Sequence, residues 1–596
     1  MDKQPTEVLI TQLQAKPGSE PHSLLQYLIH IQHKFSHISQ QAIDVLVNKL
    51  GVTEAQVRGV IDFYAFLHHT PRGQYNILVS DSITDHMLGS RALLQQLCAQ
   101  LGVEPGVPRA DGRVCVQTTS CTGMCDQGPA LLVNDQVITR LDAERIRHIA
   151  ELIEQQIPLA GWDSDFFVVE DNIRRSDLLL EMGLTKGAAI RSWQQQGSEA
   201  ILAQLDQSGL RGRGGAGFKT SLKWKFCRQA EDQQRYVVCN ADEGEPGTFK
   251  DRVLLNSYAD EVIEGMTLCG AVIGADKGFI YLRGEYFYLL EKLEAKLQQR
   301  REQGLLGNNI LGIDGLNFDL EIHLGAGAYI CGEESALIES LEGKRGIPRN
   351  RPPFPVTNGY LNKPTVVNNV ETFMAAAGIA VHGGDWFRVA GTADSGGTKL
   401  HSISGNCARP GIYEYPLGTP IRQMLADCGA ENTQAVQVAG AAGETLFADE
   451  FDRSISFEDV ASGGSLMVFN QQRNMLDMVQ NFAHFFVHES CGFCTPCRVG
   501  GSLLSDLLDK LQKGHASDYD LQEMQQLAGL MQQASHCGLG STAPNAFLHT
   551  LSKAPQLYRQ QLKVSDFEPA FDLDQALSEA RRLAGVNRTD TMESEL

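Results

Sequence analysis

The sequence is short of positive charge, of long apolar runs and of any leader segment. It carries 51 Lys and Arg against 72 Asp and Glu, a formal net charge of −21. Phosphate backbones require basic patches, so this balance argues against nucleic acid or an anionic membrane as a partner. The first residues, MDKQPTEVLITQLQ, contain no apolar stretch of signal-peptide length. No apolar run reaches about 20 residues, and Glu264 interrupts the best one, 262–275. The sequence therefore predicts a cytoplasmic protein without a membrane segment.

Cysteine, in contrast, is plentiful, and four of the fourteen cysteines form a pattern near the C-terminus. Cys491, Cys494 and Cys497 make a Cys-x2-Cys-x2-Cys run, and Cys537 follows 40 residues later. Such a run can surround one [4Fe-4S] cluster, with each thiolate binding one iron. Zinc is the alternative, although structural zinc sites usually pair their ligands as two Cys-x2-Cys units. Close spacing without an export signal does not favour disulfides.

Hydrophobic periodicity predicts an α/β protein of several domains, about four by length. Three helices are expected within 22–70, the third capped by Thr53, followed by a small α/β region with a hairpin turn at Asn134-Asp135. After these regions the sequence predicts, in order, a glycine-rich α/β region, a β-rich module, a helical region and a polar, disordered tail. The predicted strands are 75–80, 114–119, 236–239, 278–282, 318–323, 401–404, 436–438 and 465–469, and further helices are predicted at about 90–101 and 142–156.

A glycine loop is the first motif that carries chemistry. Five glycines lie within the nine residues 209–217. Glycine allows positive φ and bare amides, which a phosphate or dinucleotide contact requires. Arg211, Arg213 and Lys223 add positive charge that can hold phosphate. The loop is not the usual G-x-G-x-x-G after a strand, and a flexible surface loop is the alternative.

Carboxylates and amides follow the predicted strands. Asp242, Glu243 and Glu245 come directly after the strand at 236–239, and side chains at the end of a buried α/β strand usually face a ligand crevice. They can accept hydrogen bonds from ribityl or ribose hydroxyls, while a solvated acidic turn is the alternative. Glu333 and Glu334 begin a helix after another glycine turn; there they can receive ribose hydroxyls and exclude a 2′-phosphate, which favours NAD over NADP. A solvated helix start is the alternative at this position.

The asparagine pair at 368–369 can bind a polar cofactor edge or simply cap a helix. Together with ESCGFCTPCR at 489–498, these four motifs, in this order, resemble the NADH-binding flavoprotein subunit of respiratory complex I over about 165–565. The resemblance implies non-covalent FMN, NAD(H) and one [4Fe-4S] cluster held by Cys491, Cys494, Cys497 and Cys537. Glu245 and Lys223 are expected to orient the reactants, because hydride chemistry belongs to the flavin. Lys219 departs from the family pattern, which has proline there.

The resemblance also assigns the other cofactor contacts. For FMN they are Gly212, Arg213, Gly214, Gly215, Ala216, Gly217, Lys223, Asn240, Asp242, Tyr329, Gly332, Asn368 and Asn369. For NADH they are Phe218, Phe226, Glu245, Glu334 and Phe354. Glu243, Glu333, Val367 and Thr372 are further expected cofactor contacts.

Residues 22–155 resemble a second family, the small thioredoxin-like partner of that flavoprotein. That family binds a [2Fe-2S] cluster through Cys-x4-Cys and Cys-x3-Cys pairs. Here Cys121 and Cys125 keep the second pair, whereas Asp81 and His86 stand at the first. Asp, His and the nearby Cys115 can ligate iron. The favoured interpretation is that the cluster is lost and the domain remains as a structural or docking unit.

Fusion of the two subunits resembles the large diaphorase subunit of cytoplasmic NAD-reducing [NiFe] hydrogenases. The implied regions are an N-terminal helical segment (1–70), a thioredoxin-like domain (71–160), a Rossmann-like FMN- and NAD-binding domain (165–390), a β-grasp-like module (395–470), a helical bundle with the iron–sulfur site (475–565) and a tail (566–596). The implied partners are a small iron–sulfur diaphorase subunit and a [NiFe] hydrogenase heterodimer. Formate dehydrogenase or complex I flavoproteins are the alternatives, and a non-catalytic iron–sulfur scaffold is the alternative of another class.

Overall fold

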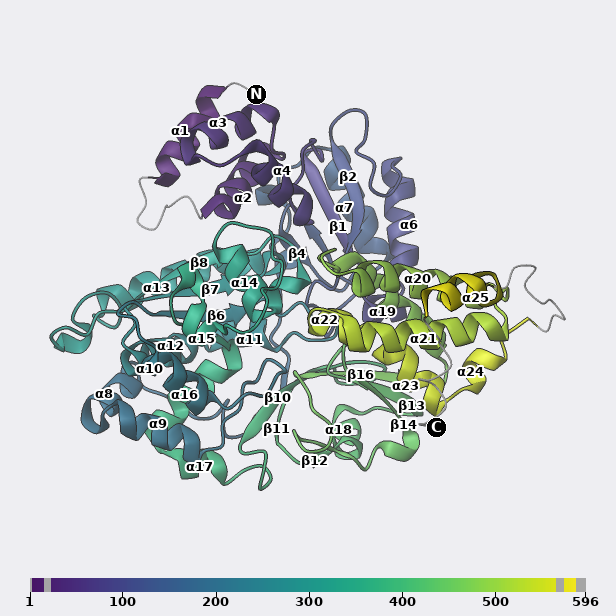
Figure 1. Cartoon of the computed structure of the whole chain (residues 1–596). Helices are drawn as coiled ribbons and strands as arrows, with labels where there is room; N and C mark the ends of the chain where they lie inside the picture. Colours follow the sequence, from purple (N-terminus) through teal and green to yellow (C-terminus); the bar gives the residue numbers. More distant parts are fainter. Residues whose placement is uncertain (1–2, 15–22, 564–572, 586–596) are drawn as a thin grey trace.

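The computed structural model describes residues 3–14, 23–563 and 573–585. At the N-terminus lie four helices, α1 (Lys3–Gln14), α2 (Leu24–Phe35), α3 (Gln40–Leu50) and α4 (Glu54–Phe63). The expected Thr53 cap is present, since its hydroxyl accepts a hydrogen bond from Gln56 N. The Gln56 side chain accepts one from Thr53 N in return, which completes a capping box. Helix α1 was not predicted. Figure 1 shows this helical segment above the α/β domain of the central part of the chain, close to strand β8 (Asp319–Leu324).

The helical segment packs into the core of the α/β domain. Its buried side chains form one continuous hydrophobic cluster with those of 178–387 and of the C-terminal bundle. Gln26 on α2 bonds the backbone of edge residue Leu324 twice, donating to its carbonyl at 2.9 Å and accepting from its N–H at 3.1 Å. Pairing of this kind covers the exposed end of an edge strand. The boundary at residue 70 therefore separates sequence regions rather than separate cores.

The thioredoxin-like domain has a four-stranded sheet in the order β2-β1-β3-β4. Strands β1 (Tyr75–Ser80) and β2 (Val114–Thr119) are parallel, as expected for a crossover through α5 (Ile83–Met87) and α6 (Ser90–Leu101). Strands β3 (Leu131–Val133) and β4 (Gln136–Ile138) form the predicted hairpin, where Asn134 and Asp135 have φ of 46° and 69°. Helix α7 (Ala143–Glu154) begins at the Asp142 cap and covers one face.

The central domain is a parallel sheet in the order β8-β7-β6-β9, formed by β6 (Tyr236–Ala241), β7 (Lys277–Leu282), β8 and β9 (Thr365–Asn369). This order makes it Rossmann-like, because β9 returns to the other side of β6 and creates a switch point between them. Strand β9 contains the asparagine pair and was not predicted as a strand. The helices of this domain are α8 (Ala188–Gln196), α9 (Ser198–Gln207), α10 (Thr220–Gln229), α11 (Lys250–Ser257), α12 (Ala259–Ile273), α13 (Leu290–Glu302), α14 (Glu334–Leu341), α15 (Pro355–Asn358), α16 (Val370–His382) and α17 (Gly384–Arg388).

The β-grasp-like module is a mixed six-stranded sheet, β14-β13-β16-β10-β11-β5, with α18 (Ile421–Cys428) packed on it. Its strands are β10 (Thr398–Gly405), β11 (Gly411–Pro416), β13 (Thr433–Val438), β14 (Glu444–Phe447) and β16 (Ser465–Asn470), beside the short pair β12 (Thr419–Pro420) and β15 (Ser454–Ile455). The sixth strand, β5 (Ile173–Arg175), lies far upstream in sequence and pairs with β11. The expected boundary at 390–395 therefore misses a piece of this sheet.

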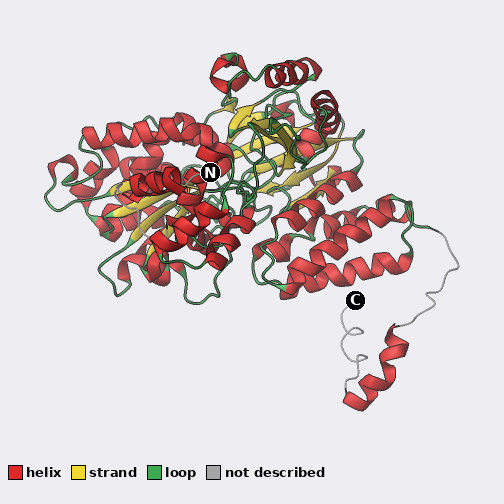
Figure 2. Ribbon diagram, turned by 90° about the horizontal axis from the view of Figure 1, so that it is seen from above, coloured by secondary structure: helices red, strands yellow, loops and turns green. Residues whose placement is uncertain are grey.

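The C-terminal bundle contains α19 (Met475–Glu489), α20 (Thr495–Gln512), α21 (Asp518–Ala534), α22 (Gly538–Thr542), α23 (Asn545–Lys553) and α24 (Gln556–Arg559). Figure 2 shows α25 (Leu573–Ala584) standing away from it. A helix at this place corrects the expectation of a wholly disordered tail; 566–572 and 586–596 lie outside the described residues. Short 3-10 turns occupy 159–161, 164–167, 284–289, 310–312, 329–332, 360–362 and 448–450. Within the described residues, no helix combines the length and apolarity needed to cross a membrane.

Candidate functional site

The candidate site is a cavity of about 610 Å³ at the carboxyl ends of β6 and β9. Asn240 lies near the end of β6 and Asn369 ends β9, so the cavity opens at the switch point of the sheet, where ligands of wound α/β folds bind. Eleven of the residues predicted from sequence line it: Gly214, Gly215, Ala216, Asn240, Asp242, Glu243, Glu245, Tyr329, Gly332, Glu333 and Asn369. Four segments far apart in sequence thus meet at one cavity.

The cavity has the properties of a flavin site. Asp242 is 9% exposed, and its Oδ2 atom has no hydrogen-bond partner among the described residues. A buried carboxylate oxygen without a donor is costly, and a hydroxyl-bearing ligand such as a ribityl chain would satisfy it. The glycines also allow close backbone approach: a Cβ on Gly214 would lie 3.1 Å from Asn369 Cβ, and one on Gly244 would lie 3.0 Å from the Tyr329 ring. The residues present therefore fit FMN.

Glu245 is held at the wall of this cavity by groups from two other segments. Tyr329 donates its hydroxyl to Glu245 Oε2, and Ala442 N donates to Oε1 at 3.0 Å. Burial raises the pKa of Glu245 to about 7, and these hydrogen bonds limit the rise. A Cβ on Gly440 would lie 2.2 Å from Glu245 Cγ, so glycine is required at that position. The carboxyl group therefore changes charge near neutral pH beside the cofactor cavity.

A buried ionic network adjoins the cavity. Lys250 Nζ contacts Asp251 at 2.6 Å, Glu243 at 3.2 Å and Glu371 at 3.3 Å. Lys399 Nζ contacts Glu371 at 2.9 Å and also donates to the carbonyl of the glycine loop at residue 213. Burial alone would raise the pKa of Glu371, but the surrounding cations lower it to about 2. Lys399 therefore links the β-grasp-like module to the glycine loop.

Some predicted residues shape the site without lining the cavity. The Arg213 guanidinium is buried and donates to Gly396 O at 2.9 Å, so it does not face a phosphate; its backbone N–H donates to Thr372 Oγ1 at 2.9 Å. Lys223 Nζ pairs with Glu334 Oε2 at 3.0 Å and donates to Val367 O at 3.1 Å.

The remaining predicted residues make contacts within the protein or are exposed. Asn368 accepts a hydrogen bond from Trp224, and Gly212 N donates one to Phe218 O. Gly217 packs on Phe457, and the residues Phe218, Phe226 and Phe354 are 48, 45 and 52% exposed.

Several cavity residues were not predicted from the sequence. They are Gly244, Thr248, Lys250, Ile330, Ala439, Ala442, Gly443, Ala461, Ser462, Gly463, Gly538, Leu539 and Thr542. Those of the β-grasp-like module lie in two small-residue loops, AGAAG at 439–443 and ASGG at 461–464. Like the 209–217 loop, these loops consist mainly of glycine and other small residues, and this composition could have predicted them as part of the site. Gly538 directly follows Cys537, so the cavity and the cysteine site share a wall.

Three of the four C-terminal cysteines lie at helix starts, and Cys491 lies in the loop between α19 and α20. Cys494 is the N-cap of α20 and Cys537 the N-cap of α22, with Cys497 in the first turn of α20. Burial raises the pKa of the Cys497 thiol to about 11, and negative charge on the other three thiols adds to the rise. Positive helix ends favour a negatively charged group at this place. No three His, Cys, Asp or Glu side chains are close enough to hold a single ion in the described part of the chain.

The other cysteine pair is packed differently. Cys121 and Cys125 are 1 and 3% exposed, and their sulfur atoms lie 3.3 Å apart. His86 Nε2 and Asp81 Oδ1, at the positions of the first pair, bond to each other at 2.6 Å. Cys115 lies on β2, where its charge raises the pKa of Cys98 after the larger effect of burial.

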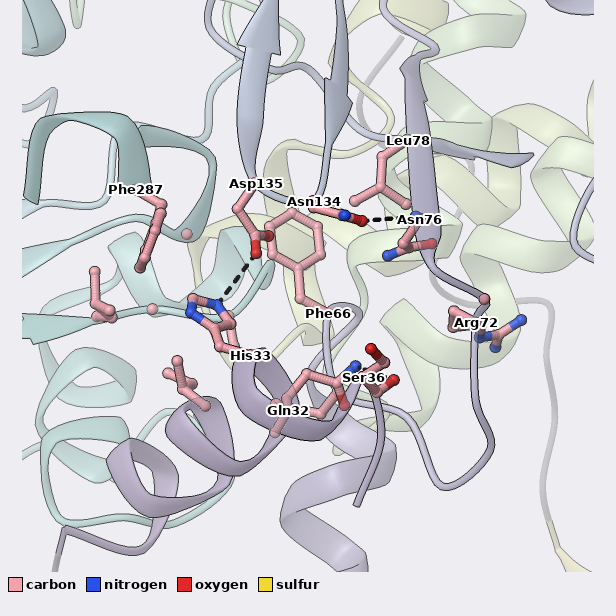
Figure 3. Close-up of a pocket in the computed structure, with 17 residues that line it drawn as sticks. Gln32, His33, Ser36, Phe66, Arg72, Asn76, Leu78, Asn134, Asp135 and Phe287 are labelled. Atoms are coloured by element: carbon pink, nitrogen blue, oxygen red, sulfur yellow. Dashed lines mark hydrogen bonds and ion pairs between the residues drawn. The ribbon is translucent and has the colours of Figure 1, made fainter. Parts of the chain in front are cut away.

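A second cavity, of about 210 Å³, lies where α2, the β3–β4 turn and the α/β domain meet (Figure 3). His33 Nε2 pairs there with Asp135 Oδ2 at 3.2 Å, and Phe287 stacks edge-on to the His33 ring. None of the residues predicted to bind a cofactor lines it. It is a junction between domains, separate from the cofactor cavity.

Comparison with known proteins agrees with this division. Residues 10–154 match the thioredoxin-like [2Fe-2S] ferredoxin family, 205–377 match the Nuo51 FMN-binding domain and 477–561 match the NADH-ubiquinone oxidoreductase-F iron–sulfur binding region. The fold and the site thus define an iron–sulfur flavoprotein of the NADH-oxidoreductase class, and the predicted fold class is confirmed.

Full-length relatives narrow the class. The chain is 42% identical over 586 residues to the NAD-reducing hydrogenase HoxS subunit alpha of Cupriavidus necator, covering 95% of this chain and 97% of that protein. It superposes with a TM-score of 0.88, 42% identity and 96 and 97% coverage on a chain of an NAD+-reducing [NiFe]-hydrogenase crystal structure in the H2-reduced state. A subunit of the NADH-quinone oxidoreductase of Aquifex aeolicus is 42% identical, covering 62% of this chain and 87% of that protein. The chain belongs to the family of NAD-reducing hydrogenase alpha subunits.

Proposed function

We propose that the protein is the diaphorase subunit of an NAD-reducing hydrogenase, which couples H2 + NAD+ to NADH + H+. The observation that carries this proposal is the shared wall between the cofactor cavity and the cysteine site, where Gly538 lines the cavity and Cys537 precedes it. Hydride exchange at a flavin and single-electron exchange at a cluster require these two sites to be neighbours. Family membership over nearly the whole chain supports the same function.

The residues of the chain have distinct tasks in this proposal. FMN, when bound, would supply the conversion between hydride exchange with NAD(H) and single-electron exchange with the cluster. Asn240, Asp242 and Asn369 hold its polar groups at the strand ends, and the glycine loop allows its phosphate to approach the backbone. Glu245 accepts from the ribose hydroxyls of NADH. Cys491, Cys494, Cys497 and Cys537 bind one [4Fe-4S] cluster.

NAD rather than NADP is the proposed nucleotide. Glu333 caps α14 by accepting from Ser335 N and Ala336 N, and Glu334 lies beside it with 25% of its side chain exposed. A 2′-phosphate placed here would meet two carboxylates that already have cationic partners: Glu334 pairs with Lys223 and Glu333 with Arg351, each at 3.0 Å. Repulsion of that extra phosphate would give the discrimination. Replacing both glutamates with glutamine should raise the activity with NADPH relative to NADH.

The thioredoxin-like domain is proposed to carry no [2Fe-2S] cluster. Cys121 and Cys125 contact each other in a closed core, while Asp81 and His86 form a pair of their own. The proposed partners are a small iron–sulfur diaphorase subunit and a [NiFe] hydrogenase heterodimer in the cytoplasm. Their presence is tested by co-purification and by nickel analysis of the complex.

Iron counting and NADH-dependent dye reduction test the proposal together. The purified full chain should contain FMN and about four irons, and it should reduce viologen with NADH. The assembled complex should reduce NAD+ with H2. A chain with flavin and iron but no NADH oxidation would overturn the function, and about six irons would overturn the loss of the second cluster.

A further inference from the structure

A chain of hydrogen bonds joins the thioredoxin-like domain to the cofactor cavity. Ser120, directly before Cys121, donates its hydroxyl to Glu489 Oε1 at the end of α19. Tyr329 N donates to the other oxygen, Glu489 Oε2, at 2.9 Å. The Tyr329 hydroxyl then donates to Glu245. Four residues from three domains are thereby connected, and the last two line the cavity.

The start of this chain is held firmly. Arg283, from the α/β domain, is 2% exposed and donates to Cys121 O at 2.6 Å. Arg252 is 1% exposed; it donates to Gly123 O at 3.0 Å and pairs with Asp126 at 2.5 Å. A Cβ on Gly123 would lie 2.4 Å from the Tyr286 hydroxyl, so the loop is in direct contact with the α/β domain. The 120–126 loop is therefore anchored to the α/β domain by several contacts.

Glu489 lies between the thioredoxin-like domain and the α/β domain and accepts a hydrogen bond from each. It lies two residues before Cys491, and both its carboxylate oxygens accept hydrogen bonds from other domains. The Tyr329 ring is also held by Phe485 on α19, with ring centroids 5.0 Å apart at 62°. Backbone, ring and hydroxyl of Tyr329 are thus each fixed by a different contact.

We propose that Ser120 and Glu489 are positioning residues for NADH oxidation, acting through Tyr329 on Glu245. The thioredoxin-like domain then has a task that needs no cluster of its own: its 120–126 loop orients the carboxylate that receives NADH. This inference rests on the proposed function, since it assigns remote residues to the same NADH site.

Ser120→Ala in the full chain loaded with FMN and cluster tests the inference. The variant loses one hydrogen bond and keeps every contact of Arg252 and Arg283. KM for NADH should rise about threefold to tenfold, while kcat with viologen, FMN content and iron content stay unchanged. Ser120→Thr, which keeps the hydroxyl, should restore the KM.

The same loop offers a matched control. Thr122 is fully buried, and its hydroxyl has no hydrogen-bond partner among the described residues. Thr122→Val should leave KM at the wild-type value. Equal KM values for wild type, Ser120→Ala and Thr122→Val would overturn the inference while leaving the function intact. Absence of NADH oxidation in the wild type itself would instead defeat the proposed function.

A double-mutant cycle separates positioning from general damage. Tyr329→Phe removes the link to Glu245 but keeps the backbone bond to Glu489. If Ser120 acts through this link, Ser120→Ala should raise KM much less in the Tyr329→Phe background than in the wild type. Additive effects would show that Ser120 acts by another route and would reject the inference.

Discussion

Two groups of cysteines in this protein come from iron–sulfur families but have opposite surroundings. Cys494 and Cys537 are the N-caps of α20 and α22, and the side chains of Cys491, Cys494 and Cys537 are partly exposed. Cys121 and Cys125 are closed in a core, where their sulfur atoms touch. The loop that carries this second pair is hydrogen-bonded to Arg252, Arg283 and Glu489. The two groups therefore differ in exposure and in the contacts of the loops that carry them.

The largest expected effect lies in the C-terminal group. Cys497→Ser should lower the iron content from about four per chain to nearly zero and abolish H2-driven NAD+ reduction in the complex. Iron analysis and low-temperature EPR measure this directly. Retention of FMN in the variant would show that the α/β domain remains folded. An unchanged iron content would remove this cysteine from the cluster.

The next effect concerns the buried ion pair that joins the 120–126 loop to the α/β domain. Arg252→Met leaves Asp126, whose side chain is fully buried, without its partner and should lower the free energy of unfolding by about 3–5 kcal/mol. Thermal and denaturant unfolding measure the loss. The control is Arg140→Met, because Arg140 and Glu170 form a pair that is 51 and 47% exposed. That variant should cost at most about 1 kcal/mol. Equal losses of stability in the two variants would contradict the expectation that the buried Arg252–Asp126 pair contributes more than the exposed Arg140–Glu170 pair.

The third prediction concerns the pH dependence of KM for NADH, which we expect Glu245 at the wall of the cavity to determine. The pKa of Glu245 is raised to about 7, so the carboxyl becomes ionised as pH rises through that value. Because only the carboxylate is a strong acceptor for ribose hydroxyls, KM for NADH should fall several-fold between about pH 6 and 8. Glu245→Gln should have a higher KM without this inflection. A variant that keeps the inflection would assign it to another group.

The smallest effect is expected in the N-terminal pair. Cys121→Ser should leave the iron content, FMN content and NADH oxidation at wild-type values, with only a modest loss of stability from the buried hydroxyl. The measurements are those used for Cys497→Ser. Loss of about two irons would mean that the thioredoxin-like domain binds a cluster after all.

Local patterns were enough to predict many elements. The strands at 75–80 and 114–119, the hairpin turn at Asn134-Asp135 and the Thr53 cap agree with the structure, because each depends on residues close in sequence. Strand β9 was missed because its asparagines equally suit a helix cap, and Asn369 indeed caps α16. Strand β5 was missed because its three residues pair with β11, which lies far downstream in the sequence.

The candidate site shows the same division. Eleven predicted residues line one cavity, since polar residues after buried strands usually face the crevice. Arg213 had the charge expected of a phosphate ligand, but its guanidinium is turned into the protein toward Gly396. Lys223 pairs with Glu334 instead of lining the cavity. Charge in a loop predicts an electrostatic preference, whereas side-chain direction depends on neighbours that only folding brings near.

Short motifs in the sequence specify the cofactor class, the order of the regions and the two cysteine groups, because each depends on residues that are close neighbours along the chain. How these regions work together depends on the tertiary structure. Ser120 and Glu489 are 369 residues apart, and Tyr329 and Glu245 are 84 apart, yet they form one chain of hydrogen bonds. No local periodicity encodes such contacts; they arise when the domains pack, since buried polar groups must find partners. Packing joins a thioredoxin-like domain with one remaining cysteine pair to the residues that form the wall of the cofactor site.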